Sequence, residues 1–305
     1  MRSKKNRDLN KVSTAWNVLF TIVLGICAVI AVAPIVLIIV ISFSSSKSID
    51  AIGYSYIPLE WSLEGYRYVS KVGTQLINSY IVTIANSVLG TVLVLLLTSM
   101  YAFVLCQKKF WLKQGLMWFA YFTTLFGAGL VPTYMMNVKY YGLKDTFLIL
   151  LLHGLVNPGW IIMLRAFINT SVPEALFDSA RIDGAGYGTV YFRIVLPLLK
   201  AGLATIGLFS FVGRWNDWYT GLLYITNAKL MPLQTMLTKM QNDIDYLRQN
   251  SKLMATPEGQ RMLQELPSDN LRMACTIVAI VPILFAYPFF QKYFVKGLVV
   301  GSVKG

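Results

Sequence analysis

Residues 18–41 read VLFTIVLGICAVIAVAPIVLIIVI, a run in which no side chain is charged. A helix needs about 20 such residues to cross the ~30 Å hydrocarbon core of a bilayer. Residues 80–105 form a second uncharged run of sufficient length. We therefore expect the chain to be built from membrane-spanning helices.

The composition supports this interpretation. Of the 305 residues, 56% are hydrophobic and 13% are charged, and the mean hydropathy is +0.58. A soluble domain carries charge on about a quarter of its residues, so an ordinary soluble enzyme is excluded. A disordered chain is excluded as well, because such chains are poor in apolar residues.

Four further apolar segments bring the number of predicted spans to six. One of them is interrupted only by Lys200, whose ammonium can reach the membrane interface. The predicted spans are 18–41, 80–105, 114–138, 146–164, 194–212 and 273–291. The pattern predicts an all-α integral membrane protein with a cytoplasmic amino-terminal segment at 1–15 and a single transmembrane domain at 16–305. Within that domain, an outer segment covers about 213–270.

The net charge of +13 indicates the orientation. Six spans put both termini on one side, which would hold more than half of the 27 Lys and Arg but less than a third of the 14 Asp and Glu. The positive-inside rule then places both termini in the cytoplasm. This distribution explains the excess of Lys and Arg over Asp and Glu without a nucleic-acid partner.

The amino-terminal run has an alternative interpretation as a cleavable signal peptide. Basic residues precede it, and the triplet from Ala31 to Ala33 has the small-residue pattern of a cleavage site. The apolar run continues to Ile41, which gives it the length of a span. We therefore expect it to be retained.

Motifs of catalysis and metal binding are missing from the sequence. There is no GxxxxGK[ST] nucleotide loop and no HExxH pair, and His153 is the only histidine. Cys27, Cys106 and Cys275 lie far apart and form no CxxC pair, which argues against a disulfide framework or a thiolate metal site. We expect no catalytic residue, no metal site and no cofactor on this chain.

A loop between the fourth and fifth spans, at about 171–197, holds the most informative motif. Ser171 is followed three residues later by Glu174, which predicts a capping box that starts a helix. Gly184 predicts that this helix ends near Ile182, and the glycines that follow it would allow a sharp turn. At about 15 Å the helix is too short to span, so we expect it to lie across the inner face and dock a partner.

The same loop resembles the EAA loop of ABC importer permeases. That pattern is Glu-Ala-Ala, three residues, Gly, nine residues, Ile, one residue, Leu-Pro, and the spacing agrees at every position. The matching residues are Asp178, Ser179, Ala180, Gly184, Ile194, Leu196 and Pro197. Asp178 replaces the usual Glu and Ser179 the first Ala, and both replacements keep the chemical type.

Neighbouring residues are similar to the carbohydrate branch of these importers, the group of the maltose and oligosaccharide systems. The similar segments are the run that begins Arg181-Ile182-Asp183 and the later Trp215-Asn216-Asp217. The resemblance implies a type I ABC importer permease fold in which a short coupling helix sits in a cleft of the ATPase. It implies ATPase-coupling roles for Glu174, Asp178, Ser179, Ala180, Arg181, Asp183, Gly184, Ile194, Leu196 and Pro197.

The resemblance also implies the partners. They are a second, similar but different permease chain, a dimer of ATPase subunits that binds ATP and Mg, and an extracytoplasmic solute-binding protein. The chain itself would be a multi-pass protein of the bacterial inner membrane, surrounded by lipid. Its solute would be an oligosaccharide.

Polar residues inside the spans are candidates for the solute pathway, because such residues usually face the bundle interior. His153 and Asn157 are four residues apart on the fourth span, so we expect them to share a face. Asn86 lies on the second span. Each of the three either contacts the solute or makes a hydrogen bond between helices.

Trp215, Asn216 and Asp217 have two interpretations as well. An aromatic face beside amide and carboxylate groups suits sugar recognition, in which the ring stacks on indole and the hydroxyls form hydrogen bonds. The alternative is an interfacial aromatic belt with a loop cap.

A secondary transporter or channel without an ATPase is the rival function. Such proteins tend to carry ionisable residues deep in their spans for coupling. Apart from His153, the centres of the predicted spans lack them. The sequence therefore favours the ATP-driven importer.

Overall fold

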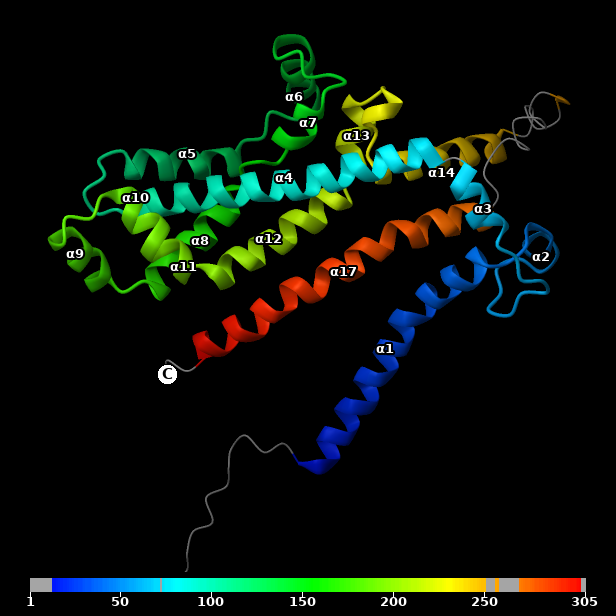
Figure 1. Cartoon of the computed structure of the whole chain (residues 1–305), viewed down its shortest axis with the longest axis horizontal. Helices are drawn as coiled ribbons and strands as arrows, with labels where there is room; N and C mark the ends of the chain where they lie inside the picture. The colour runs from blue at the N-terminus through cyan, green and yellow to red at the C-terminus, as the bar shows by residue number, and fades with distance from the viewer. Residues whose placement is uncertain (1–12, 72, 251–255, 258–268, 303–305) are drawn as a thin grey trace, which may run out of the picture. The chain divides into compact units, whose positions relative to one another are not determined.

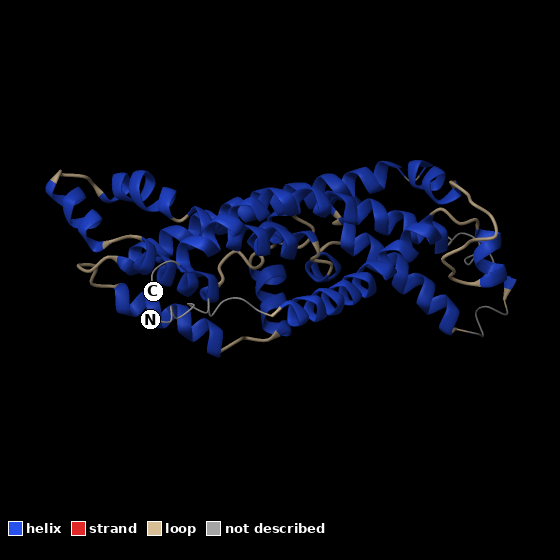
Figure 2. Cartoon of the chain, turned by 90° about the horizontal axis from the view of Figure 1, so that it is seen from below, coloured by secondary structure: helices blue, strands red, loops and turns tan. Residues whose placement is uncertain are grey.

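The computed structural model describes residues 13–71, 73–250, 256–257 and 269–302. Within these residues the chain consists of helices and loops, as Figure 2 shows, with one isolated bridge between Ser44 and Trp61. This confirms the predicted helical class. Most of the predicted segment 1–15, and residues 251–255 and 258–268 of the predicted outer segment, lie outside the described residues.

The chain divides into two compact units, residues 1–70 with 267–277 and residues 71–266 with 278–305. The first unit contains α1 (Thr14–Ser42), α2 (Ser46–Ile52), α3 (Glu64–Lys71) and the first turns of α17 (Asp269–Ser302). Buried Asn270 donates from Nδ2 to the Ser44 carbonyl over 3.2 Å. This bond fastens the segment after α1 to the start of α17.

The second unit is assembled around α4 (Gly73–Cys106). Figure 1 shows α12 running beside it, and α8 also packs on it. Its other described helices, in chain order, are α5 (Lys113–Leu125), α6 (Leu130–Met135), the π-helix η1 (Met136–Tyr140), α7 (Phe147–Leu152), α8 (Pro158–Ser171), α9 (Glu174–Ile182), α10 (Tyr187–Thr189), the π-helix η2 (Val190–Val195), α11 (Leu196–Leu198), α12 (Lys200–Trp215), α13 (Tyr219–Tyr224), the 3-10 helix η3 (Ala228–Leu230), α14 (Leu233–Gln249) and the part of α17 from residue 278 onward.

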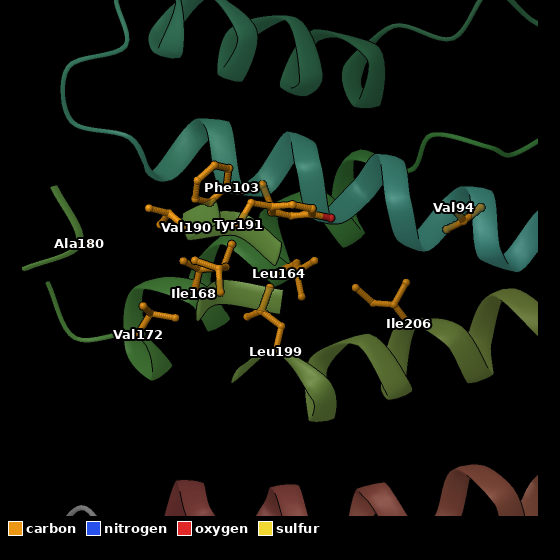
Figure 3. Packing of buried hydrophobic residues seen from close by; sticks show 12 residues of the cluster. Val94, Phe103, Leu164, Ile168, Val172, Ala180, Val190, Tyr191, Leu199 and Ile206 are labelled. Atoms are coloured by element: carbon orange, nitrogen blue, oxygen red, sulfur yellow. The ribbon is translucent and has the colours of Figure 1, made fainter. Parts of the chain in front are cut away.

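An apolar core joins the helices of the second unit. Figure 3 shows Phe103 of α4 lying over Tyr191 of η2, with Leu164 and Ile168 of α8 below them. The rings of Phe103 and Tyr191 are 5.4 Å apart between centroids and tilted by 52°. Ala180 of α9 belongs to the same core, so the short helix is anchored to the bundle.

One face of α4 carries glycine and polar side chains, most of them hydroxylated, and all of these residues are buried. They recur about every three or four positions, which is the spacing of one helix face. They are Ser79, Thr83, Asn86, Ser87, Gly90, Thr91, Thr98 and Ser99. Thr83 Oγ1 accepts the Leu233 N–H over 2.8 Å, and Thr91 Oγ1 donates to Ser210 Oγ over 3.4 Å. Small residues and interhelical hydrogen bonds are what close helix packing in a membrane requires.

Two helices among the described residues, α1 and α4, are each long and apolar enough to cross a membrane. Two bent pairs of helices, α5 with α6–η1 and α10–α11 with α12, raise the count to four if each pair forms one span. Residues 273–291, the predicted sixth span, lie within α17. The count of six spans therefore stays a prediction.

The third and fifth predicted spans are not single helices. The third, 114–138, is broken between Leu125 and Leu130 with a bend of 116°, where Gly129 has a φ of +82° that favours glycine. The fifth, 194–212, bends by 78° at Leu199. Pro197 lies two residues before that bend, and proline lacks the N–H of a continuous helix.

Candidate functional site

The short helix predicted in the loop exists as α9, and it ends at Ile182 as predicted. The Gly184 N–H donates to the Arg181 carbonyl over 3.1 Å, and the Ala185 N–H donates to the Ala180 carbonyl over 2.9 Å. This pair of bonds is a Schellman motif, which requires a left-handed residue after the C-cap. Gly184 supplies it with a φ of +74°.

The predicted capping box at the start of this helix is wrong. Ser171 is the last residue of α8, and Pro173 is the N-cap of α9 with no side-chain cap. A residue that is still helical cannot take the extended conformation of an N-cap. The turn after α9 also differs from the prediction, because Gly188 lies inside α10 and the left-handed position belongs to Gly184.

Charged side chains connect α9 to the loop that follows α4. The Nη1 atom of Arg181 lies 3.4 Å from Asp178 Oδ1, within α9 itself. Its Nη2 donates to Gln107 Oε1, in the loop, over 3.5 Å. Lys108 and Glu174 form an ion pair. Exposed pairs of this kind contribute about 0–1 kcal/mol each, so they add little to the stability of α9.

The two faces of α9 differ. Ala180 is only 6% exposed and packs with Val172 and Val190, whereas Ile182 is 86% exposed. The small residue therefore provides close packing within the chain. The exposed face carries Ile182 together with Asp178 and Ser179.

The remaining residues of the EAA-like stretch lie after α9. Ile194 and Leu196 are half-buried and pack against the same apolar core. Pro197 lies in α11, just before the 78° bend. Asp183 is the C-cap of α9. The stretch thus leads from α9 through the bend into α12.

The shared helix face predicted for His153 and Asn157 is wrong. α7 ends at Leu152, and His153 is its C-cap in an extended conformation. Asn157 is the N-cap of α8, where its Oδ1 accepts the Trp160 N–H over 3.3 Å. The backbone between them is not helical, because Gly154 has a φ of +64° and Pro158 starts a new helix.

Trp215, Asn216 and Asp217 form the junction between α12 and α13. Trp215 is 1% exposed, and its indole N–H donates to the Ala279 carbonyl over 3.2 Å. Asn216 is the C-cap of α12, and Asp217 Oδ1 accepts the Thr220 N–H over 3.0 Å at the start of α13. The buried Trp215 ring cannot stack on a solute in this conformation.

Arg214 is a buried arginine to which sequence reasoning assigned no role. Its guanidinium donates to the main-chain carbonyls of Leu150, Leu151 and His153 and to Asn86 Oδ1, over 3.0 to 3.3 Å. Asn86 is 3% exposed, so the hydrogen bond between helices is the interpretation that the structure supports for it. The signal in the sequence was an arginine just beyond the apolar run 194–212.

Arg214 also explains how the break after α7 is tolerated. The last carbonyls of a helix have no partner within the helix, and its carboxyl end carries partial negative charge. The buried guanidinium of Arg214 donates hydrogen bonds to these carbonyls, and its positive charge lies beside the negative end of the helix. It thereby fastens the end of α7 to α4 and α12.

Comparison with known proteins identifies the family. Residues 100–300 match the family described as binding-protein-dependent transport system inner membrane component. The chain belongs to this family. Members are permease components of ABC transporters and not enzymes, because a separate ATPase subunit hydrolyses ATP. This assignment confirms the predicted permease and decides against a secondary transporter or channel.

Several relatives of this permease component are similar over most of their length. The polygalacturonan/rhamnogalacturonan transport system permease protein YtcP of Bacillus subtilis is 34% identical over 91% of this chain and 94% of its own. Protein LplC of the same organism is 35% identical over 98% and 97%. A subunit in the crystal structure of a bacterial ABC transporter involved in the import of the acidic polysaccharide alginate superposes with a TM-score of 0.78, at 26% identity, over 93% of this chain and 99% of that subunit.

Membership in this family implies three kinds of partner. A binding-protein-dependent importer works with a solute-binding protein, an ATPase and a second permease. The family is described as an inner membrane component, and α1 and α4 of this chain have the length and the apolar composition to cross a membrane.

Proposed function

We propose that this chain is one of two permease subunits of an ATP-driven importer for oligosaccharides. Relatives named for transport of polygalacturonan, arabinooligosaccharides, and melibiose, raffinose and stachyose support this solute class. The second permease is a similar but different chain. The solute-binding protein delivers the solute from outside, onto the segment 213–270.

The proposed topology has six spans, with both termini in the cytoplasm of a bacterial cell. α1 and α4 provide the first two, and the bent pair α5 with α6–η1 provides the third. The broken pair α7 and α8 is the fourth, α12 with its preceding bent segment is the fifth, and α17 is the sixth. The surplus of Lys and Arg on the side of the termini supports this orientation.

In this proposal α9 is the coupling helix. The observation that carries it is a short helix ended by the Gly184 Schellman motif, with one face anchored by Ala180 and the other exposing Ile182. A rigid anchored helix can transmit the movement of a partner to the segments behind it. ATP and Mg bind to the dimer of ATPase subunits, and this chain binds no cofactor.

A first experiment tests the contact. In a variant whose three native cysteines are replaced by alanine, Ile182→Cys should cross-link to the ATPase subunit with a maleimide–amine reagent. Ala180→Cys is the matched control, because its side chain is buried and should react little. No cross-link at Ile182 in an assembled complex would contradict the docking role of α9.

A second experiment tests the coupling. Gly184→Ala places a side chain at a left-handed position, which costs about 1–2 kcal/mol and distorts the end of α9. We expect ATP hydrolysis to continue while uptake falls. Gly186→Ala is the control, since Gly186 has an ordinary φ of −72° and nothing lies within 4 Å of an added Cβ. Equal uptake by the two variants would refute the proposal.

A further inference from the structure

A cavity of about 490 Å³ lies in the second unit beside the break between α7 and α8. This volume is within the ~300–1,000 Å³ that is typical of small-molecule sites. Its apolar wall is formed by Leu143, Ile149 and Leu152. Its polar and aromatic lining comes from Asn137, Tyr141 and His153.

The position of the cavity explains why the backbone can be irregular there. The non-helical segment from His153 to Asn157 falls in the middle of the predicted fourth span. At membrane depth such backbone is tolerated only where protein covers it or where it lines a water-filled space. Arg214 satisfies the carbonyl of His153, and Gly154 lines the cavity itself.

The polar groups that line the cavity have unused hydrogen-bonding capacity. Asn137 donates from Nδ2 to the Tyr224 hydroxyl over 3.1 Å, and this leaves its Oδ1 as an acceptor. Tyr224 is itself buried and stacks on Tyr134 at 5.5 Å, so the Asn137 amide is held in place. The His153 side chain is exposed, and the two ring nitrogens of its imidazole can form hydrogen bonds.

Tyr141 adds an aromatic face to this lining. It is 63% exposed, and its ring is available to a ligand. A pyranose ring has apolar C–H faces and a rim of hydroxyls, so it needs an aromatic or apolar wall together with groups that donate and accept hydrogen bonds. Asn137, Tyr141 and His153 meet these needs in one cavity.

We infer that this cavity is a contact site for one sugar ring of the solute on its way through the membrane. The inference rests on the proposed function, because it takes the oligosaccharide class from it. It adds Asn137 and Tyr141 to the solute pathway, and it gives His153 a role as a hydrogen-bonding group. The site recognises the ring and its hydroxyls, which neutral and acidic sugars share.

The test uses the complete importer in proteoliposomes, with its binding protein and ATPase. Three labelled probes, raffinose, trigalacturonate and arabinotriose, are supplied, and the one taken up fastest by the unmodified complex is used. Removing the ring in Tyr141→Ala should lower uptake per assembled complex about tenfold, whereas Tyr141→Phe should lower it only about twofold. The matched control is Tyr140→Ala, since Tyr140 is 70% exposed but does not line the cavity.

A second measurement covers the case in which these variants assemble poorly. With the native cysteines replaced, His153→Cys should react with a maleimide about threefold more slowly while the probe is being transported, and Tyr140→Cys should not change. Unchanged labelling of His153→Cys, or uptake by Tyr141→Ala equal to that of Tyr140→Ala, would overturn the inference and leave the proposed function standing. No uptake of any probe by the unmodified complex would contradict the proposed function and the inference with it.

Discussion

The guanidinium of Arg214 occupies the space where Gly90 has no side chain. A Cβ at Gly90 would lie 2.6 Å from Arg214 Cζ, and real Cβ atoms do not approach other atoms so closely. Gly90 is one turn after Asn86, which accepts a hydrogen bond from the same guanidinium. The position of the Arg214 guanidinium on α12 therefore depends on the absence of a side chain at Gly90 on α4.

Gly90→Ala should destabilise the protein. Over-packing of this kind costs about 1–3 kcal/mol, because the hydrogen-bonded guanidinium has to move. We expect a lower Tm in detergent, measured by a thiol-reactive dye. Gly213→Ala is the control, since nothing lies within 4 Å of a Cβ there and α12 is helical at that point. An equal Tm for both variants would show that the close approach does not matter.

Arg214→Lys should be destabilising as well, although it keeps the charge. A lysine ammonium cannot reach three carbonyls and the Asn86 amide with the geometry of a planar fork. Buried carbonyls that lose their donors cost about 1–3 kcal/mol each. The same thermal assay measures the loss, and exposed Arg193→Lys serves as its control. A Tm within error of the parent would refute this role of the guanidinium.

Ser99 and Tyr191 should show an asymmetric effect. Their hydroxyl oxygens are 2.7 Å apart, and Ser99 Oγ also bonds to the Leu95 carbonyl over 2.6 Å. Ser99→Ala leaves the buried Tyr191 hydroxyl without this partner, which costs about 1–3 kcal/mol, whereas Tyr191→Phe leaves Ser99 with a carbonyl. The first change should lower the Tm more than the second. In the double variant the effects should not add, and additive shifts would exclude coupling between the two residues.

Asp145 should make stability depend on pH. A hydrogen bond from the Thr226 hydroxyl and those from the N–H groups of Asn227 and Thr226 lower its pKa below the ordinary 3.8. Because the pKa is lower in the folded protein, this stabilisation is complete above pH 3.8 and is lost as the pH falls through the folded pKa. The parent should therefore exceed Asp145→Asn in Tm at pH 7, and the gap should narrow below pH 3.8. Asparagine tolerates the φ of +55° at this position, so a gap that does not vary with pH would contradict the assignment.

The end of α9 was predictable because it depends on a local signal. Gly184 can take a left-handed conformation, and the helix stops there whatever surrounds it. The start was mispredicted because Ser171 had two possible roles and the longer α8 incorporated it. A capping motif in the sequence cannot reveal that a preceding helix has not yet ended.

The breaks in the spans were missed although their signals were present. Asn157 followed by Pro158 has the form of an N-cap followed by N1, and Gly154 lies just before. Hydropathy averages over such residues, so a broken span and a straight one look alike. Arg214 was missed for a different reason. Its hydrogen bonds go to carbonyls some 60 positions earlier in the chain, and only the tertiary structure brings them close to the guanidinium.

In the proposed coupling role of α9, the bend at Leu199 sets the direction in which movement reaches α12. The segment Tyr187–Leu198 meets α12 at 78°, which is close to a right angle. A push along the first axis has only a small component along the second, so it moves α12 mostly sideways. The connection after α9 would therefore convert a displacement along the segment Tyr187–Leu198 into a sideways rotation of α12.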